Sequence, residues 1–185
     1  GRFYDKFRDR VIFPIINTSG KVIGFGGRAL SNDVMPKYLT SPENRVFQKK
    51  NNLYTLNITR QDIGKAGMAI IVEGYMDVIS LHQAGFTNTV AALGTAFTTE
   101  QAKLISRYTK EIIITFADAA GQKAALRGID VLKGENCKVK VLHVTDGKDP
   151  DEYVKKNGKE ANAKVPEFKH VKAIGVKDTL ASGSI

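Results

Sequence analysis

The sequence predicts an α/β protein in which helices cover both faces of a mostly parallel sheet, preceded by a smaller basic α+β subdomain. From residue 68 onward, four short apolar runs alternate with segments of helical periodicity, as in parallel sheets buried on both faces. A hairpin pattern precedes them, and positive charge is concentrated near the start of the chain. We expect the basic subdomain at 1–66, the larger domain at 67–160 and an unassigned tail at 161–185.

The composition agrees with this division. A chain of 185 residues with 42% hydrophobic content can bury one sizeable core and carry a smaller subdomain. Of the net charge of +9, most lies in residues 1–60, with 11 Lys and Arg against four Asp and Glu. This asymmetry favours a polyanion-binding part beside a part that uses carboxylates. No apolar run approaches the roughly 20 residues of a membrane span, so we expect a cytoplasmic protein without membrane contact.

The first 60 residues divide into a hairpin and an irregular segment. The β-rich runs VIFPII and KVIGF flank the turn-forming sequence NTSG, which predicts a hairpin over residues 10–28. Residues 29–60 are polar and weakly periodic, which predicts a loop-rich surface segment and not a core.

The larger domain begins with the strand MAIIVE and a helix through MDVISLHQAG, which Gly85 can end. NTVAAL is the second strand, and Thr98 and Gln101 have capping-box spacing at the start of the next helix. EIIITF, the third strand, leads to a helix that Gly134 can end. KVKVLHV is the fourth strand, before a short helix DEYVKKNG. Cys137 is the single cysteine, which excludes a disulfide within this chain, and we expect it to be a buried structural thiol.

Acidic residues follow three of the four predicted strands. Glu73 ends the first strand and Asp77 lies four residues later; Asp118 follows the third strand, and Asp149 and Asp151 follow the fourth. The carboxyl ends of parallel strands share one edge of the sheet, where ligands bind. Clustered carboxylates require a neutralising cation, and oxygen ligands suit Mg²⁺ or Mn²⁺. The pattern therefore predicts a divalent metal site for phosphoryl or nucleotidyl transfer.

Glycines follow the same strands. Gly74, Gly94 and Gly121 come after the first, second and third strands, where a missing side chain lets the backbone approach a phosphate or turn sharply. A GxxxxGK[ST] phosphate loop does not occur in the sequence, which disfavours an ordinary P-loop ATPase.

Read together, EGYMDV, ALGTA and DPDEY resemble the Toprim signature of primases, topoisomerases and some nucleases. FRDRVIFPI, GFGGR, KYLTSPEN and VFQK resemble, in that order, the basic motifs that flank Toprim in bacterial DnaG-type primases. The resemblance covers about residues 1–160. It implies a Toprim-type fold and metal-dependent synthesis of RNA primers from ribonucleoside triphosphates on single-stranded DNA during replication.

The resemblance also implies roles for individual residues. Glu73 matches the proposed general acid or base, and the metal-binding aspartates match Asp77, Asp118, Asp149 and Asp151. The positions that hold template or incoming nucleotide match Arg8, Arg10, Arg28, Lys37, Tyr38 and Lys49. The implied partners are the template, the nucleotides, the RNA–DNA hybrid product and, for the full-length protein, a replicative helicase. Mg²⁺ or Mn²⁺ is the metal expected, and zinc is not expected in this chain because the sequence shows no counterpart of the family's zinc ribbon.

One motif departs from the family pattern. The family has Tyr-Asp-Gly-Asp-Ala-Ala-Gly after the third strand, whereas this chain has TFADAAG. Alignment on Ala-Ala-Gly puts Phe116 in place of the first aspartate, unless one residue is missing. Two alternatives stay open: another Toprim enzyme, such as a topoisomerase fragment or a nuclease, and a catalytically impaired module that binds nucleic acid or nucleotides.

Overall fold

The computed structural model describes residues 4–93, 97–116, 119–143 and 173–175. The chain forms two compact units that divide after Gln48. Helix α1 (Leu56–Ala66) belongs to the second unit because it contacts strands β4 (Met68–Val72) and β5 (Thr89–Ala91). The structural division after Gln48 is made by contacts and does not test the predicted domain boundary between residues 66 and 67. That boundary stays a prediction.

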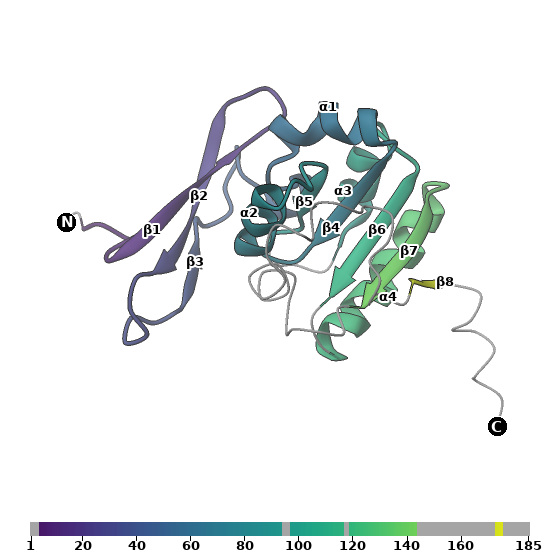
Figure 1. Cartoon of the computed structure of the whole chain (residues 1–185). Helices are drawn as coiled ribbons and strands as arrows, with labels where there is room; N and C mark the ends of the chain where they lie inside the picture. The colour runs from purple at the N-terminus through teal and green to yellow at the C-terminus, as the bar shows by residue number, and fades with distance from the viewer. Residues whose placement is uncertain (1–3, 94–96, 117–118, 144–172, 176–185) are drawn as a thin grey trace. The chain divides into compact units, whose positions relative to one another are not determined.

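The first unit is a three-stranded antiparallel sheet in the order β1-β2-β3, formed by β1 (Arg10–Ile16), β2 (Val22–Ala29) and β3 (Tyr38–Thr40) (Figure 1). The turn between β1 and β2 is built on Asn17, whose Oδ1 accepts hydrogen bonds from the N–H groups of Ser19 and Lys21, both at 3.0 Å. Gly20 takes a φ of +80°, a conformation that glycine adopts without strain. The predicted hairpin is confirmed.

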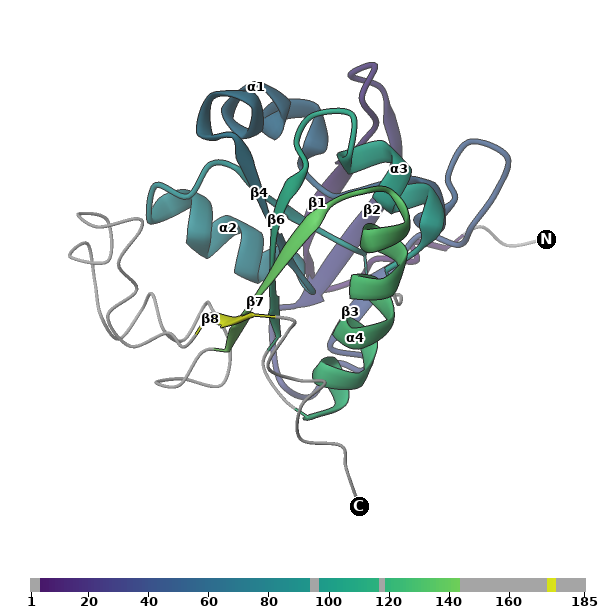
Figure 2. The same ribbon diagram turned by 90° about the vertical axis from the view of Figure 1, so that its right-hand side faces the viewer.

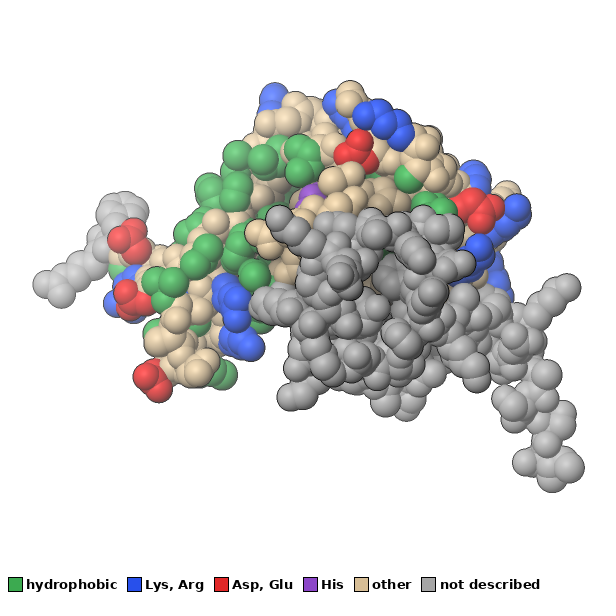
Figure 3. Space-filling model, in the orientation of Figure 1, with side chains coloured by type: hydrophobic (Ala, Val, Ile, Leu, Met, Phe, Trp, Pro, Cys, Tyr) green, Lys and Arg blue, Asp and Glu red, His purple; other side chains and the backbone are tan. Residues whose placement is uncertain are grey.

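Aromatic rings lie close to glycines in β2. A Cβ atom at Gly24 would lie 3.2 Å from Cδ1 of Phe47, and one at Gly27 would lie 2.8 Å from Cδ1 of Phe7. Phe47 is fully buried, with Ile15 at 1% exposure. The glycines of GFGGR therefore make room for packing side chains. Figure 3 shows hydrophobic side chains at the surface over β1 to β3; the exposed large ones in this unit are Tyr4, Val11, Ile12, Val22, Phe25, Leu30, Met35, Tyr38 and Val46.

The second unit is a five-stranded sheet in the order β5-β4-β6-β7-β8. Strands β5, β4, β6 and β7 are parallel, and β8 pairs antiparallel with β7. Besides α1, β4 and β5, the elements are η1 (Lys49–Asn51), α2 (Tyr75–Gln83), α3 (Thr99–Ile105), β6 (Glu111–Phe116), α4 (Ala119–Gly134), β7 (Lys138–His143) and β8 (Ala173–Gly175). The predicted α/β class and the four parallel strands are confirmed.

Helices cover both faces of this sheet. Figure 2 shows α2 on one side and α3 and α4 on the other. Ala69 and Ile71 of β4 belong to a core cluster with Ile105 of α3 and Leu132 of α4. Ile70 and Val72, the alternate residues of β4, are also buried, so β4 is covered on both faces. This burial explains why the strand sequences are continuously apolar.

The expectation that residues 29–60 contribute no core is wrong. Phe47 is fully buried in the first unit, and Leu53 and Leu56, at 3% and 1% exposure, join the core cluster of the second. Helix α1, whose Ile63 is fully buried, was not predicted from the sequence. Polar residues such as Asn57 and Arg60 separate the apolar positions of this helix. Its average composition is therefore hydrophilic, and the short row of buried residues does not stand out in the sequence.

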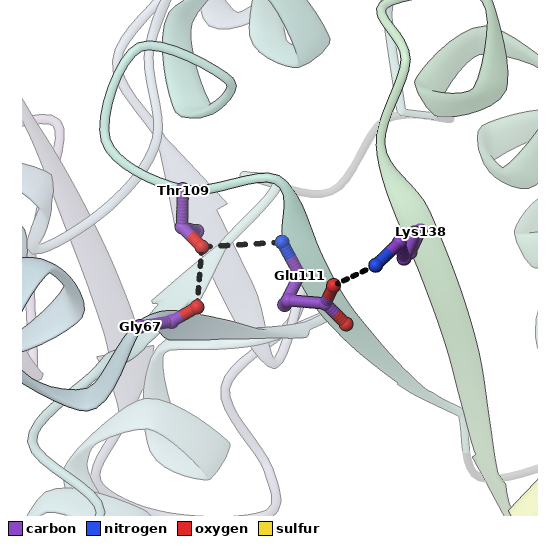
Figure 4. Close-up of polar contacts among 4 residues, drawn as sticks. All are labelled: Gly67, Thr109, Glu111 and Lys138. Atoms are coloured by element: carbon purple, nitrogen blue, oxygen red, sulfur yellow. Dashed lines mark hydrogen bonds and ion pairs between the residues drawn. The ribbon is translucent and has the colours of Figure 1, made fainter.

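The amino ends of the parallel strands are linked by side chains (Figure 4). The hydroxyl of Thr109 donates to the carbonyl of Gly67 at 2.6 Å and accepts from the N–H of Glu111 at 3.1 Å. The Glu111 carboxylate pairs with Lys138 Nζ at 3.0 Å across β6 and β7. Both ion-pair side chains are exposed, so the pair adds little stability. These contacts fix the register of the edge opposite the predicted site.

Several local predictions agree with the structure. Thr98 and Gln101 form the expected capping box at the start of α3, and Gly85 follows α2 with a φ of +92°. Cys137 is a free, buried cysteine. Within the described residues, no helix is long and apolar enough to cross a membrane. The predicted helix DEYVKKNG lies outside the described residues.

Candidate active site

The candidate site begins where β4 ends. Val72 is the last residue of β4, Glu73 and Gly74 follow it, and Tyr75 begins α2. Strand β4 pairs with β6, and the helices that follow these two strands lie on opposite sides of the sheet (Figure 2). Such a change of side creates a crevice at the carboxyl ends of adjacent strands, where α/β proteins bind ligands. Glu73, which is exposed, is located at this point.

Asp77 is held at the same place by a backbone contact. Its Oδ2 accepts a hydrogen bond from the N–H of Gly74 at 3.1 Å. Gly74 has an extended conformation and precedes the first residue of α2, so Asp77 satisfies one of the unpaired N–H groups at the helix start. The negative charge also interacts favourably with the helix dipole. The half-buried Asp77 carboxylate is therefore positioned beside the backbone that carries Glu73.

The ends of β6 and β7 continue this edge. Ile71 is level with Ile114 of β6, and extending that register by two residues brings Glu73 level with Phe116. Phe116 in turn is paired with His143, the last residue of β7. The position that lacks the family aspartate therefore ends β6 at the edge of the sheet that Glu73 follows.

The remaining predicted acids follow these strands in the chain. Asp118, Asp149 and Asp151 lie outside the described residues, as does Gly94. Gly121 is within α4. Among the residues that the structure does describe, no group of three or more His, Cys, Asp or Glu side chains could hold a metal ion. The structure thus places two of the five acids, Glu73 and Asp77, at one strand end.

A pair of tyrosines supports the start of α2. The rings of Tyr54 and Tyr75 meet edge to face, with centroids 4.9 Å apart and planes at 84°. Both side chains are buried. Tyr54 is anchored to the end of β5, because its N–H donates to the carbonyl of Ala91 at 2.9 Å. Burial raises the pKa of the Tyr54 phenol, and Tyr75 adds to the rise. Tyr54 was not among the predicted residues; the apolar run LYTL, which leads into α1, was the available signal.

Four predicted nucleotide-binding residues gather at one end of the sheet in the first unit. Tyr38 pairs with Arg28 across β2 and β3, so their side chains share a face. The Lys37 Nζ lies 5.9 Å from the centre of the Tyr38 ring. Arg10 Nη1 donates to the carbonyl of Lys37 at 3.4 Å, although Arg10 is paired with Ala29 and starts from the opposite face. These basic residues therefore share an end of the sheet and not a single face.

The other two predicted basic residues lie elsewhere. Arg8 is exposed and precedes β1. Lys49 is half-buried and begins the 3₁₀ turn η1 in the second unit. The predicted strip is thus divided between the two units.

Two family models match consecutive parts of the chain. The model of the DNA primase catalytic core, N-terminal domain, matches residues 1–60, and a Toprim-like model matches residues 70–154. A DNA primase of Clostridium acetobutylicum is 57% identical over 160 residues, which cover 85% of this chain and 26% of that protein. The chain belongs to the DnaG-type primase family. It spans about a quarter of the length of this primase.

Solved primase structures have the same fold. A crystal structure of the zinc-binding and RNA polymerase domains of the Aquifex aeolicus primase superposes with a TM-score of 0.80 at 44% identity, covering 86% of this chain and 40% of that one. A DnaG primase catalytic domain bound to single-stranded DNA superposes with a TM-score of 0.78 at 43% identity, covering 85% and 51%. The expected primase resemblance and Toprim-type fold are confirmed, and the topoisomerase and nuclease alternatives are not favoured.

Proposed function

We propose that this chain is part of a primase catalytic core that synthesises short RNA primers from ribonucleoside triphosphates on single-stranded DNA. The observation that carries the proposal is the placement of Glu73 and Asp77 at the end of β4, at the change of side between α2 and α4. In α/β sheets, ligands bind at such a change of side, and here two carboxylates follow the strand end. The similarity to primases supports primer synthesis as the reaction.

The side chains at this edge fit a divalent cation. Glu73 is exposed and Asp77 Oδ2 accepts from the N–H of Gly74, so two carboxylates follow the end of β4 within one turn of the chain. Oxygen ligands suit Mg²⁺ or Mn²⁺, with Asp118, Asp149 and Asp151 as the further proposed ligands. A bound divalent ion would neutralise charge on the phosphates during nucleotidyl transfer. Glu73 is the proposed general acid or base.

The basic residues are proposed to bind the polyanionic substrates. Arg10, Arg28, Lys37 and Tyr38 share one end of the β1–β3 sheet, and Arg8 precedes it. Lysine and arginine side chains bind phosphates without reading sequence, which suits a template of any sequence. The exposed ring of Tyr38 beside Lys37 offers a stacking surface for a base or nucleotide. Lys49, in the second unit, is proposed to bind template or incoming nucleotide.

The wider setting is also part of the proposal. The partners would be the DNA template, the nucleotides, the RNA–DNA hybrid and, through parts of the relatives outside this chain, a replicative helicase. The place of action would be the replication fork in the cytoplasm. Gly74 and Gly94 are proposed to let the backbone approach phosphates.

The proposal is tested by ribonucleotide incorporation on a single-stranded DNA template with Mg²⁺ or Mn²⁺. We expect Glu73→Gln to reduce incorporation by about a hundredfold or more, the usual scale for loss of an acid–base group. Glu111→Gln is the matched control, because the exposed Glu111 side chain begins β6 at the edge of the sheet opposite the predicted site. Equal rates in the two variants would contradict the role of Glu73. If the unsubstituted chain binds DNA but incorporates no ribonucleotides, the alternative of a catalytically impaired module that binds nucleic acid would be favoured.

A further inference from the structure

Gln101 uses every polar group of its side chain although it is completely buried. Nε2 donates to the carbonyl of Lys49 at 3.1 Å and to that of Asn52 at 2.9 Å. Oε1 accepts from the N–H of Thr98 at 3.1 Å. A carboxamide has two N–H donors and one carbonyl, so this set is complete, as burial at 0% exposure requires. One side chain therefore joins the start of α3 to both ends of the turn at residues 49–52.

Thr98 makes a second connection between the same two segments. Its Oγ1 donates to the carbonyl of Lys50 at 2.7 Å and accepts from the N–H of Gln101 at 3.2 Å. The N–H of Asn52 closes the turn on the carbonyl of Lys49 at 3.1 Å. Capping α3 requires only the oxygens of Thr98 and Gln101 as acceptors. The three donations to residues 49–52 go beyond what the helix itself needs.

The connected turn carries two adjacent lysines. Lys49 is half-buried and Lys50 is exposed, and neither lies in a long helix or strand that would fix its backbone. A side chain that must meet a phosphate binds better when its backbone is held in place by neighbouring residues. The hydrogen bonds from Gln101 and Thr98 supply this support at three carbonyls.

We propose that Gln101 and Thr98 are positioning residues that hold Lys49 and Lys50 in the arrangement in which they bind phosphates of a single-stranded nucleic acid. This rests on the proposed function, in which Lys49 contacts template or nucleotide. It adds Lys50 to the basic set and assigns the capping box of α3 a role beyond helix stability. The Lys49–Asn52 turn and α3 both belong to the second unit, so the support is internal to it.

The test is binding of the chain to a fluorescein-labelled single-stranded DNA oligonucleotide, followed by anisotropy over a range of salt concentrations. Lys49→Ala is expected to weaken binding about tenfold, as for a lost charge-assisted hydrogen bond. It should also lower the slope of log K against log salt by about 0.7, the value for one phosphate contact on a single strand. Gln101→Glu keeps an acceptor for Thr98 but removes both donors to the turn. We expect it to weaken binding about threefold, a typical indirect coupling.

The decisive comparison is made in the background of Lys49→Ala with Lys50→Ala. If Gln101 acts through these lysines, Gln101→Glu has no further effect on affinity or salt slope there. A general structural defect would weaken binding equally in both backgrounds and would overturn the proposal. Thr98→Val and Thr98→Ser form a second pair, because valine removes the hydroxyl and serine restores it. Weakening by valine and recovery with serine are expected, and equal binding by the two would also contradict the proposal.

Ile105→Val serves as the control for stability. Ile105 is fully buried in α3 and contributes no hydrogen bond to the turn, so this variant loosens the helix without touching the lysines. Its DNA affinity is expected to match that of the unsubstituted chain. If Lys49→Ala leaves binding unchanged, the proposed role of Lys49 fails and this inference fails with it. If Lys49→Ala weakens binding but Gln101→Glu and Thr98→Val do not, only the inference fails.

Discussion

Asp77 accepts a hydrogen bond from the backbone N–H of Gly74 at 3.1 Å, so a carboxylate is fixed against the turn that follows strand β4. This contact has two separate consequences, one for stability and one for metal binding. It stabilises the start of α2, and it fixes an oxygen ligand beside Glu73. Variants that separate these two consequences give the sharpest test of the site.

Asp77→Asn and Asp77→Ala separate helix capping from metal binding. Asparagine keeps an oxygen for the Gly74 N–H, so we expect its free energy of unfolding to stay within about 0.5 kcal/mol of the parent. Alanine loses the acceptor and is expected to cost about 1 kcal/mol. Both remove the negative charge and should weaken Mn²⁺ binding. Urea unfolding and Mn²⁺ titration measure the two effects, and parental Mn²⁺ affinity in Asp77→Asn would reduce Asp77 to a helix cap.

Gly74→Ala tests the close approach at the same turn. A Cβ atom at residue 74 would lie 3.1 Å from Asp77 Oδ2, which is tight enough to displace the carboxylate by a few tenths of an ångström. The backbone at Gly74 is extended and accepts alanine, so we expect a folded protein that loses about 0.5–1 kcal/mol of stability and binds Mn²⁺ more weakly.

The control for this variant is Gly64→Ala. Gly64 lies within α1, and a Cβ atom there would meet nothing within 4 Å. Alanine is the better helix former, so this variant is expected to gain about 0.5–1 kcal/mol and to keep the parental Mn²⁺ affinity. If both variants bound Mn²⁺ equally, the contact between Gly74 and Asp77 would have no part in metal binding.

Stability is expected to fall in alkaline solution because of two buried acids. Burial raises the pKa of the Tyr54 phenol above its ordinary value of 10.0 and that of the Cys137 thiol above 9.0. Tyr75 adds to the first rise; for the thiol, Lys110 opposes the rise and Glu135 adds to it. The unfolded chain therefore loses these protons at lower pH than the folded chain, and the free energy of unfolding decreases as pH rises.

Single substitutions show how much Tyr54 and Cys137 each contribute to the decrease in the free energy of unfolding. Cys137→Ala should flatten the curve from about pH 9, and Tyr54→Phe should flatten it from about pH 10, because each removes one titrating group. Phenylalanine keeps the edge-to-face contact with the Tyr75 ring. The measurement is urea unfolding between about pH 8 and pH 11, and unchanged slopes in both variants would exclude these groups as the cause.

Phe116 offers a direct test of the missing aspartate. It ends β6, and both it and Glu73 lie two residues beyond the last pair of β4 and β6, Ile71 with Ile114. Both Phe116→Asp and a chain with an aspartate inserted between Phe116 and Ala117 add a carboxylate at this strand end. We expect the better of the two to raise Mn²⁺ affinity by a factor on the order of ten and to increase ribonucleotide incorporation. No gain in either would mean that the departure from the family motif is compensated elsewhere.

The sequence predicted much of the larger domain because its elements have strong local signals. The apolar runs around Ile71 and Ile114 can only be strands buried on both faces, and the spacing of Thr98 and Gln101 marked a helix start. The basic hairpin was equally clear from its turn residues. Glu73 and Asp77 could be proposed because they follow a strand in a parallel sheet.

The features that could not be predicted from the sequence depend on contacts between residues far apart in the chain. The burial of Phe47 and Leu56 arises from packing against residues far along the chain, within a segment whose average composition is polar. The edge-to-face contact of Tyr54 with Tyr75 and the bonds from Gln101 to the Lys49 turn join segments 21 to 52 residues apart. Neither periodicity nor spacing encodes such pairs. The positions of Asp118, Asp149 and Asp151 stay predictions.

The most direct test of the metal site is Mn²⁺ titration of the chain, followed by electron paramagnetic resonance. The parent is compared with Glu73→Gln and with the double variant Asp149→Asn/Asp151→Asn, and circular dichroism establishes that each is folded. We predict saturable Mn²⁺ binding by the parent that both variants weaken. Absence of binding by the folded parent, or equal binding by all three proteins, would contradict a catalytic metal site at the carboxyl end of β4.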